Sequence, residues 1–328
     1  MNWNDKVILL TGGTGSFGQK FTEVVLKKYT PKKLIIFSRD EFKQHEMAKI
    51  FPDGKFKIRY FLGDVRDKDR LYRAFEGVDY VIHAAALKHV PALEYNPMEA
   101  VKTNVIGADN IVDAAIDRGI KKVIALSSDK AVNPINLYGA TKLAAEKIFV
   151  AANAYAGKKV KFACVRYGNV VGSRGSVIPF FLDLKKRNIK EFPVTDERMT
   201  RFWITLEEGV ELVVKALEEA EGGEVLVPII PSMKITDLVK AIDPKARLKI
   251  IGIRPGEKIH ETLISEDESR QTRIFDGMYV ILPQFVERGE VRKKYDKYPA
   301  PEDGFIYRSD KNEDWVTVAK LQKMIKNL

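Results

Sequence analysis

Residues 126–142 concentrate side chains that can accept or donate protons. Tyr138 and Lys142 are four residues apart, so on one helix they lie on the same face. A lysine ammonium nearby favours the phenolate and would lower the pKa of Tyr138. Such a pair can remove a proton from an alcohol while a hydride leaves its carbon. Asp129 and Lys130, just upstream, add an acid and a base that a simple dehydrogenase does not need.

Each pattern has an ordinary alternative. A tyrosine and a lysine with this spacing occur on many helix surfaces, and Asp129-Lys130 can be a surface ion pair after a strand. The catalytic interpretation depends on position, because the strand-like run Lys122–Leu126 leads in and the helix-like run Leu143–Val150 follows. Loops at the carboxyl ends of parallel strands form binding sites. We therefore predict that the catalytic residues are Asp129, Lys130 and Tyr138.

A glycine-rich turn near the N-terminus predicts a dinucleotide-binding unit. Gly12 allows a tight turn, Gly15 lets the backbone approach a pyrophosphate, and Gly18 allows close helix–strand packing. A buried strand, a helical run and a second buried strand surround the turn: Lys6–Thr11, Phe17–Lys28 and Leu34–Phe37. A structural turn without a ligand is the alternative. The predicted cofactor contacts here are Gly12, Thr14, Gly15, Ser16, Phe17 and Gly18.

The end of the second strand indicates which dinucleotide binds. An acidic residue there would bond the ribose 2′-hydroxyl of NAD, whereas basic residues accommodate the 2′-phosphate of NADP. Ser38 occupies the expected acidic position, and Arg39 and Lys43 can neutralise a phosphate. We therefore predict NADP. Asp40 leaves NAD as the alternative, because a shift in register would place its carboxylate on the ribose.

Later strands supply the remaining predicted cofactor contacts. After the strand Phe56–Leu62, Asp64 can accept a hydrogen bond from an adenine amino group or cap the next helix. Small residues after the strand Tyr80–His83 leave room for a cofactor, and Asn104 is expected to open a helix over Val105–Arg118. The predicted contacts are Asp64, Val65, Ala84, Lys88, Asn104, Tyr138, Lys142 and Val170.

Strict alternation of strands and helices stops after a sixth predicted strand, Lys161–Arg166. We predict an α/β protein with a Rossmann-type doubly wound parallel sheet and a smaller C-terminal substrate-binding domain. Charged residues beyond Glu266 are expected to form a lid or a subunit contact. The expected division assigns residues 1–168, with returning elements around 202–230, to the NADP-binding domain, and 169–201 and 231–328 to the substrate-binding domain and tail.

Composition restricts the class of partner. The 328 residues carry a net charge of +10, but basic and acidic residues are interleaved and no nucleic-acid-binding motif is present. We therefore expect a pocket for an anionic small molecule and no nucleic acid. No apolar run approaches the roughly 20 residues that span a bilayer, and Met1–Lys6 does not read as a signal peptide. The single Cys164 fits a reducing cytoplasm. We assign no metal ligands and no membrane partner.

Seven motifs carry a resemblance to a known family: Thr11–Gly18, Ser38–Glu41, Ala84–Pro91, Ser128–Lys142, Arg166–Ser176, Arg198–Thr205 and Ile253–Lys258. Together they resemble the 5-inverting UDP-N-acetylglucosamine 4,6-dehydratases, extended short-chain dehydrogenases/reductases that begin pseudaminic acid biosynthesis. The resemblance covers residues 1 to about 270. A sister group of dehydratase/epimerases carries methionine at the position of Tyr138, so this tyrosine favours the pseudaminic branch.

The resemblance implies a mechanism. Tyr138 helps to deprotonate the hydroxyl on carbon 4 of UDP-N-acetylglucosamine while a hydride passes to NADP. Lys130 removes the proton on carbon 5, Asp129 protonates the departing hydroxyl on carbon 6, and the hydride returns to carbon 6. Reprotonation of carbon 5 from the opposite face inverts that centre. A free lysine has a pKa near 10.4, so we expect burial or positive charge to lower that of Lys130 by about three units.

The resemblance also implies the substrate contacts, which are Lys88, Asn169, Arg174, Thr195, Met199, Arg201, Arg254 and Glu257. It implies a homo-oligomer built from dimers, possibly a hexamer, and a product used in flagellin glycosylation or a surface polysaccharide. The alternatives are another UDP-sugar epimerase or reductase on the same fold and a non-enzymatic NADP-binding regulator. An epimerase does not need the Asp-Lys pair, and such regulators usually lose the tyrosine or the lysine.

Overall fold

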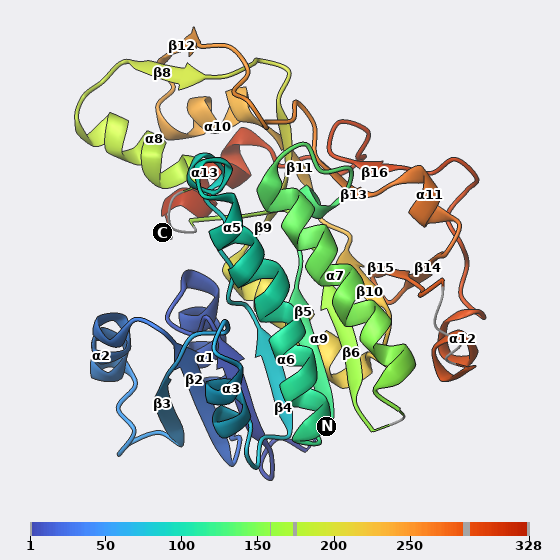
Figure 1. Ribbon diagram of the computed structural model, residues 1–328. Coiled ribbons are helices and arrows are strands. Elements are labelled where there is room, and N and C mark those ends of the chain that lie inside the picture. The colour runs from blue at the N-terminus through green and yellow to red at the C-terminus, as the bar shows by residue number, and fades with distance from the viewer. Residues whose placement is uncertain (1, 158, 173–175, 285–288, 327–328) are drawn as a thin grey trace.

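The computed structural model describes residues 2–157, 159–172, 176–284 and 289–326 (Figure 1). A nine-stranded sheet organises this part of the chain, in the order β14-β15-β10-β6-β5-β4-β1-β2-β3. The strands from β3 to β10 run parallel, whereas β15 is antiparallel to both of its neighbours. Their bounds are β1 Val7–Thr11, β2 Lys33–Ser38, β3 Ile58–Leu62, β4 Tyr80–His83, β5 Lys122–Leu126, β6 Lys161–Val165, β10 Val225–Pro228, β14 Thr272–Phe275 and β15 Met278–Ile281. The predicted doubly wound parallel sheet is confirmed.

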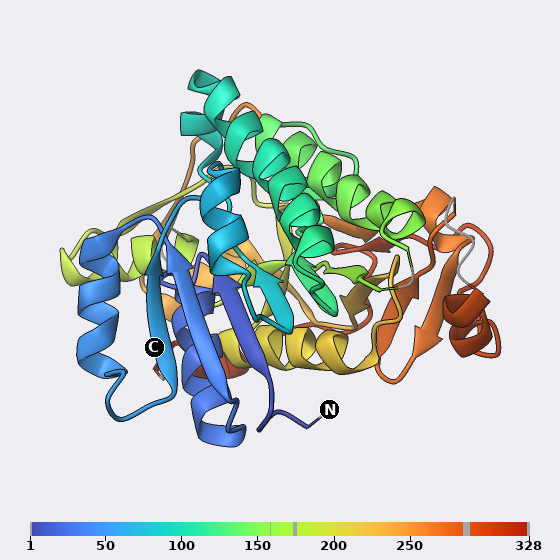
Figure 2. The same ribbon diagram turned by 60° about the horizontal axis from the view of Figure 1, so that its bottom comes forward.

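Helices cover both faces of the sheet. In Figure 2, α6 and α7 lie on one face, and α1 and α9 lie on the other. The central strands are buried on both sides by these layers, which explains their continuous apolar runs. The helices of this part are α1 Ser16–Lys28, α2 Glu41–Ile50, α3 Lys68–Ala74, α4 Val90–Tyr95, α5 Pro97–Ala100, α6 Gly107–Asp117, α7 Leu137–Tyr155 and α9 Leu206–Glu219.

A second apolar core lies beyond the carboxyl ends of the parallel strands, towards the top of Figure 1. It is built mainly from α8 Val177–Lys186, α10 Ile235–Ile242, α13 Val318–Lys326, β8 Glu191–Val194 and β9 Thr200–Ile204. The smaller elements of the chain are β7 Asn169–Val170, β11 Ser232–Lys234, β12 Arg247–Ile250, β13 Thr262–Ile264, β16 Tyr307–Arg308, α11 Glu266–Ser269 and α12 Gly289–Tyr295. No helix of the described residues is long and apolar enough to cross a membrane.

Three local features differ from the expectation. Asn104 does not open a helix, because it lies inside a π-helical segment, Val101–Ile106, that continues without a break from α5 into α6. The apolar run Leu248–Ile253 predicts a strand that leads directly into Arg254, but β12 ends at Ile250, so Arg254 follows the strand only after an intervening loop. β14 and β15 extend the large sheet, although both fall in the range expected for the substrate-binding domain and tail. Their place depends on pairing with β10, which no local pattern indicates.

A buried arginine joins the catalytic side of the sheet to the C-terminal region. The side chain of Arg166 is fully buried at the end of β6 and pairs with Glu146 of α7, at 2.5 Å between Nη2 and Oε1. It also pairs with Glu268 of α11 at 2.8 Å and donates to the carbonyl of Leu263 at 2.8 Å. Charge buried in this way needs all of its partners, because desolvation is not recovered when one is lost.

We therefore expect Glu146→Gln to lower the free energy of unfolding by about 2–4 kcal/mol, since it leaves a buried guanidinium short of one charge. Chemical denaturation measures this loss. The matched control is Glu211→Gln, which breaks a Lys28 pair whose side chains are 54% and 60% exposed. That change should cost less than about 1 kcal/mol. Equal losses in the two variants would contradict the assignment.

Candidate active site

The chain that leaves β5 forms the floor of the candidate site. A short 3₁₀ turn, Asp129–Ala131, follows the strand beyond the carboxyl edge of the sheet. Its first amide donates a hydrogen bond to the carbonyl of Tyr167, after β6, at 3.2 Å. Asn136 then caps α7 by accepting a hydrogen bond from the amide of Gly139, which places Tyr138 in the first helical turn. Local elements thus bring the three predicted catalytic side chains to one edge of the sheet.

Ser128 connects these three side chains. Its hydroxyl donates to Asp129 Oδ1 at 2.8 Å, accepts from the amide of Lys130 at 3.3 Å and hydrogen-bonds the side chain of Tyr138. Lys130 Nζ lies 3.0 Å from both carboxylate oxygens of Asp129 and 3.2 Å from Asn169 Oδ1. The predicted catalytic residues and one predicted substrate contact therefore form a single hydrogen-bonded network.

A carboxylate that the sequence analysis did not identify completes the network. Glu261 Oε1 lies 3.4 Å from Lys130 Nζ, and the Glu261 side chain is only 4% exposed. The residue stands immediately before β13, far from Lys130 in the chain. The nearby motif Ile253–Lys258 indicates that this segment contributes to the site. The motif includes Glu257 but ends before Glu261.

The charges of this network oppose the expected basicity of Lys130. Burial favours its neutral amine, but the carboxylates of Asp129 and Glu261 more than offset burial and raise the pKa of Lys130. The expected lowering of this pKa is therefore wrong. Burial also raises the pKa of Asp129, and the nearby charge of Glu261 adds to the rise. Both members of the pair thus hold their protons more strongly than exposed side chains do.

Tyr138 and Lys142 also differ from the expectation. Burial raises the pKa of Tyr138, and the charge of Lys130 and the hydrogen bond with Ser128 offset this only in part. The expected lowering of the Tyr138 pKa by Lys142 is not found. The ammonium of Lys142 instead donates to the carbonyl of Leu126 at 2.5 Å. Its own pKa is lowered by burial.

The segment before β13 is fastened to the catalytic turn and to β9. Lys258 Nζ donates to the carbonyl of Val132 at 2.6 Å. Arg201 donates to the carbonyls of Lys258 and Ile259 at 3.0 and 2.9 Å, and its guanidinium also lies 3.7 Å from Glu261. Arg201 is therefore a buried anchor of this segment in the structure.

Two of the other predicted substrate contacts, Met199 and Glu257, lie next to this anchor. Thr195 donates to the sulfur of Met199 at 2.8 Å, and both side chains are buried. Glu257 lies 3.9 Å from Arg201. Arg254 is exposed. Arg174 lies outside the described residues.

Asn104 holds the loop that carries Lys88. Its side-chain amide donates to the carbonyl of Leu87 at 2.9 Å and to Thr141 Oγ1 at 3.0 Å, and its oxygen accepts from the amide of Leu87 at 2.8 Å. Desolvation and the charge of Lys130 both lower the pKa of Lys88. Lys88 therefore faces the same charged network as Lys130.

The glycine-rich turn has the geometry of a phosphate cradle. A Cβ on Gly18 would lie 2.3 Å from the carbonyl oxygen of Gly13, so only glycine permits this close packing. α1 begins after Gly15, which has no side chain to cap the helix, so its first turn can offer N–H groups to an anion. Thr14 and Ser38 are joined by a hydrogen bond of 2.9 Å at the end of β2.

Two aspartates near this cradle have defined partners. Asp40 caps α2, accepting from the amide of Lys43 at 3.0 Å and pairing with its ammonium at 2.8 Å. Both of its carboxylate oxygens are thus engaged within α2. Asp64 lies 3.6 Å from Arg39. The cap of α3 is Asp67, so the alternative that Asp64 caps this helix is wrong.

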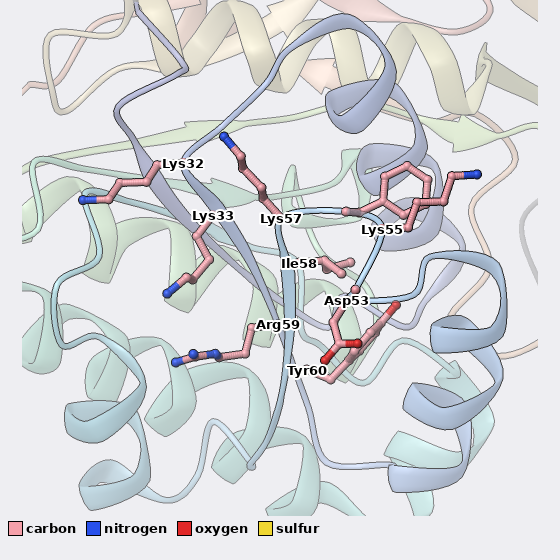
Figure 3. A pocket seen from close by; sticks show the side chains of 10 residues that line it. Lys32, Lys33, Asp53, Lys55, Lys57, Ile58, Arg59 and Tyr60 are labelled. Carbon is pink, nitrogen blue, oxygen red and sulfur yellow. The ribbon is translucent and has the colours of Figure 1, made fainter.

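A cavity of about 500 Å³ lies elsewhere, along the starts of β2 and β3 (Figure 3). Most of its side chains are basic, and Figure 3 shows Lys33 on β2, Arg59 on β3 and Lys57 just before β3. None of its lining residues is a predicted site residue. Charged side chains on the outermost strand of a sheet discourage edge-to-edge pairing with another chain.

Comparisons with known proteins bear on this site. The profile of the family described as polysaccharide biosynthesis protein matches residues 8–283. A UDP-N-acetylglucosamine 4,6-dehydratase (inverting) from Campylobacter jejuni is 55% identical over 329 aligned residues, covering 98% of each chain. A UDP-glucose 4-epimerase from Rickettsia felis is 44% identical over 84% of this chain and 83% of its own.

Solved structures share the architecture. Pen from Bacillus thuringiensis superposes with a TM-score of 0.89 at 38% identity, over 100% of this chain and 99% of its own. DesIV, a dTDP-glucose 4,6-dehydratase from Streptomyces venezuelae with NAD bound, has a TM-score of 0.70 at 19% identity, over 98% and 96%. The latter likeness concerns the fold alone.

Gly139 offers a test of the contact between α7 and the catalytic turn. A Cβ at this position would lie 2.2 Å from the carbonyl oxygen of Lys130, so Gly139→Ala must push the helix away from the turn. We expect a loss of about 1–3 kcal/mol in the free energy of unfolding, as for other overpacked sites. Chemical denaturation provides the measurement.

The matched control is Gly209→Ala in the first turns of α9, where an added Cβ meets nothing within 4 Å. Alanine there should be neutral or stabilise by up to about 1 kcal/mol, because it favours the helix. If both variants behaved alike, the close approach of α7 to the catalytic turn would be disproved.

Proposed function

Because this chain belongs to the polysaccharide biosynthesis protein family, we propose that it is a UDP-N-acetylglucosamine 4,6-dehydratase that inverts carbon 5. The observation that carries this proposal is the hydrogen-bonded Asp129–Lys130 pair beside Tyr138. Hydride transfer alone would use the tyrosine, whereas loss of water also requires an acid and a base. The inverting dehydratase of Campylobacter jejuni, similar over almost the whole chain, has this activity in its name.

We propose that a nicotinamide dinucleotide binds along the glycine-rich turn, where the close approach at Gly18 and the start of α1 fit a pyrophosphate. When bound, it supplies the hydride acceptor for carbon 4 and the hydride donor for carbon 6. Most of the predicted residues that would hold it follow the carboxyl ends of β1, β2, β3 and β4, whereas Tyr138 and Lys142 stand on α7. DesIV, which shares the fold, binds NAD.

The proposed elimination needs only one proton shared between Asp129 and Lys130. Lys130 must be neutral to take the proton from carbon 5, and Asp129 must be protonated to give one to the hydroxyl that leaves carbon 6. Transfer of the Lys130 proton to Asp129, across their 3.0 Å hydrogen bond, prepares both groups together. The high pKa of Lys130 is therefore compatible with its role as the base, because the acceptor is adjacent.

Tyr138 completes the set as the group that takes the proton of the hydroxyl on carbon 4, and it would do so as the phenolate, which the charge of Lys130 and the positive charge of a bound oxidised nicotinamide would favour against the effect of burial. The proton taken from carbon 5 remains on Lys130, and the hydroxyl of carbon 6 departs as water with the proton from Asp129. A proton delivered to the opposite face of carbon 5 then inverts that centre, and it balances the proton that Tyr138 took from the hydroxyl on carbon 4, so that the tyrosine returns to its starting state. The net change is the loss of one water molecule.

The proposed dinucleotide is NADP. Arg39 follows Ser38 directly at the end of β2, where a 2′-phosphate would be placed, and Lys43, whose ammonium lies 2.8 Å from Asp40, stands in the first turn of α2. Asp40 competes poorly for the ribose of NAD, because its oxygens bind the amide and the ammonium of Lys43.

We expect Arg39→Ala to weaken NADP about tenfold or more, since a charge-assisted hydrogen bond contributes roughly 1.5–3 kcal/mol. The affinity for NAD should change less than about twofold. Calorimetric titration with each dinucleotide measures both values. Lys49→Ala, in the last turn of α2, is the control and should leave both affinities unchanged. Tighter binding of NAD than of NADP by the unaltered protein would refute the choice of cofactor.

We expect Lys130→Ala to lose dehydration by at least about a hundredfold, because a general base contributes roughly 10²–10⁴ in rate. In deuterated water, the variant should also fail to place deuterium on carbon 5 of the sugar. Mass spectrometry and NMR of the sugar measure the two effects. Lys147→Ala, an exposed site on α7, is the control. Wild-type exchange at carbon 5 in the Lys130 variant would exclude this lysine as the base.

The similarity to the Rickettsia felis protein named UDP-glucose 4-epimerase favours one second candidate, a 4-epimerase. The Asp129–Lys130 pair argues against it, because exchange of configuration at carbon 4 requires no departing hydroxyl. Incubation with UDP-N-acetylglucosamine separates the two: a dehydratase product loses one water, whereas an epimer keeps its mass. A non-enzymatic regulator would return the sugar unchanged in mass and configuration.

We further propose that the protein acts in the cytoplasm as a homo-oligomer built from dimers, possibly a hexamer. Its product would enter pseudaminic acid biosynthesis, for flagellin glycosylation or a surface polysaccharide. The resemblance to inverting dehydratases and the single buried Cys164 support these proposals.

A further inference from the structure

Glu261 is a buried carboxylate for which the proposed reaction has no role. Its Oε1 lies 3.4 Å from Lys130 Nζ and 3.7 Å from Arg201 Nε, and its Oε2 lies 4.0 Å from Lys258 Nζ. Oε2 is buried and makes no hydrogen bond to the described residues. Three cations from three separate segments thus converge on one carboxylate that solvent barely reaches.

The backbone around Glu261 is held rigidly. Its amide donates to Ser309 Oγ at 3.0 Å, and its carbonyl accepts from the amide of Ser309 at 2.8 Å. The Ser309 hydroxyl also bonds Thr200 Oγ1 at 2.6 Å, at the start of β9. Ser309 and Thr200 are themselves buried. The carboxylate is therefore presented to the catalytic turn from a fixed position rather than from a flexible loop.

We propose that Glu261 is a positioning residue that holds the Lys130 ammonium beside Asp129 and sets the pH at which this pair loses its shared proton. This inference rests on the proposed function, because it concerns the acid and base of that reaction. Oxygens of Asp129, Glu261 and Asn169 surround Lys130 Nζ at 3.0–3.4 Å, enough to engage its three N–H groups.

The direction of the effect follows from the charges that face Lys130. The titratable groups that face Lys130 are Asp129, Glu261, Arg201, Lys258, Lys88 and Tyr138. Cations outnumber carboxylates around this amine, so each carboxylate matters to its protonation. The charges of Lys130, Arg201 and Lys258 more than offset burial and lower the pKa of Glu261, so its carboxylate is ionised where Lys130 titrates.

Removal of this negative charge must lower the pKa of Lys130, because burial and the remaining cations then act against one carboxylate only. The pair competent for elimination carries one proton, and it becomes inactive when that proton is lost at high pH. Glu261 therefore extends the alkaline range of the site. An opposite charge within about 4–6 Å commonly shifts a pKa by one unit or more, which is the change we expect here.

The test is the reactivity of Lys130 in the full-length Glu261→Gln variant without any ligand. Trace acetic anhydride labels only neutral amines, and peptide mass spectrometry follows Lys130 as the pH is varied. A fall of one pH unit in its pKa raises the labelling rate about tenfold near pH 9. The matched control, Glu266→Gln, alters an exposed glutamate of α11 and should label at the wild-type rate.

A merely structural role gives a different pattern. If the glutamine variant only opened the site, labelling would rise by the same factor at every pH, and the titration midpoint would stay in place. A midpoint for Lys130 within about 0.3 pH units of wild type, in a variant that denatures cooperatively, overturns the proposal. Should glutamine prevent folding, Glu261→Asp withdraws the carboxylate by one methylene. That variant should show a smaller fall, and a midpoint unchanged or higher overturns the proposal equally.

The labelling test also separates this inference from the proposed function. It requires no substrate, so a shifted Lys130 midpoint in a protein that does not dehydrate UDP-N-acetylglucosamine refutes only the proposed reaction. If the protein dehydrates the sugar, the alkaline limb of kcat should move to lower pH by the same amount, with KM little changed. Dehydration with an unmoved alkaline limb and an unmoved midpoint refutes only the role of Glu261.

Discussion

The site depends on the cost of placing a largely buried ammonium group, with a side chain 25% exposed, near the edge of a sheet. Lys130 is tolerated there because two carboxylates lie within 3.4 Å of its nitrogen, and one of them, Asp129, has a side chain only 1% exposed. A buried carboxylate in turn requires cations, which Arg201 and Lys258 provide for Glu261. The network is satisfied only when the catalytic turn, β9 and the segment before β13 are all in place.

This requirement explains why the two apolar cores must meet at the site. The turn after β5 belongs to the large sheet, whereas Trp203 of β9 and Met199, which immediately precedes this strand, belong to the second core. The hydrogen bonds from Arg201 and Lys258 to backbone carbonyls join the two parts without a covalent link. A substitution in either core can therefore alter the positions of Asp129 and Lys130 even when the substituted residue does not contact the sugar.

The same network changes the chemical interpretation of Lys130. A lone lysine would act as a base at neutral pH only with a strongly lowered pKa, but the carboxylates here raise it. Acid and base that share one proton do not need this lowering, since the proton lost by one is the proton required by the other. The pairing of Asp129 with Lys130 is then a feature of the chemistry as well as of the packing.

Local signals in the sequence were sufficient to predict the parallel part of the large sheet, the glycine-rich turn and the helix that carries Tyr138, because apolar periodicity, glycine spacing and strand-end position are read over short stretches. It also singled out Asp129 and Lys130, which one short turn brings together. Only the tertiary structure identified Glu261, the anchoring contacts of Arg201 and the place of β14 and β15 in the sheet. Each of these depends on partners distant in the chain. The direction in which the pKa of Lys130 shifts also depends on distant partners. Burial lowers this pKa and the neighbouring carboxylates raise it, so only the packed structure determines which effect is larger.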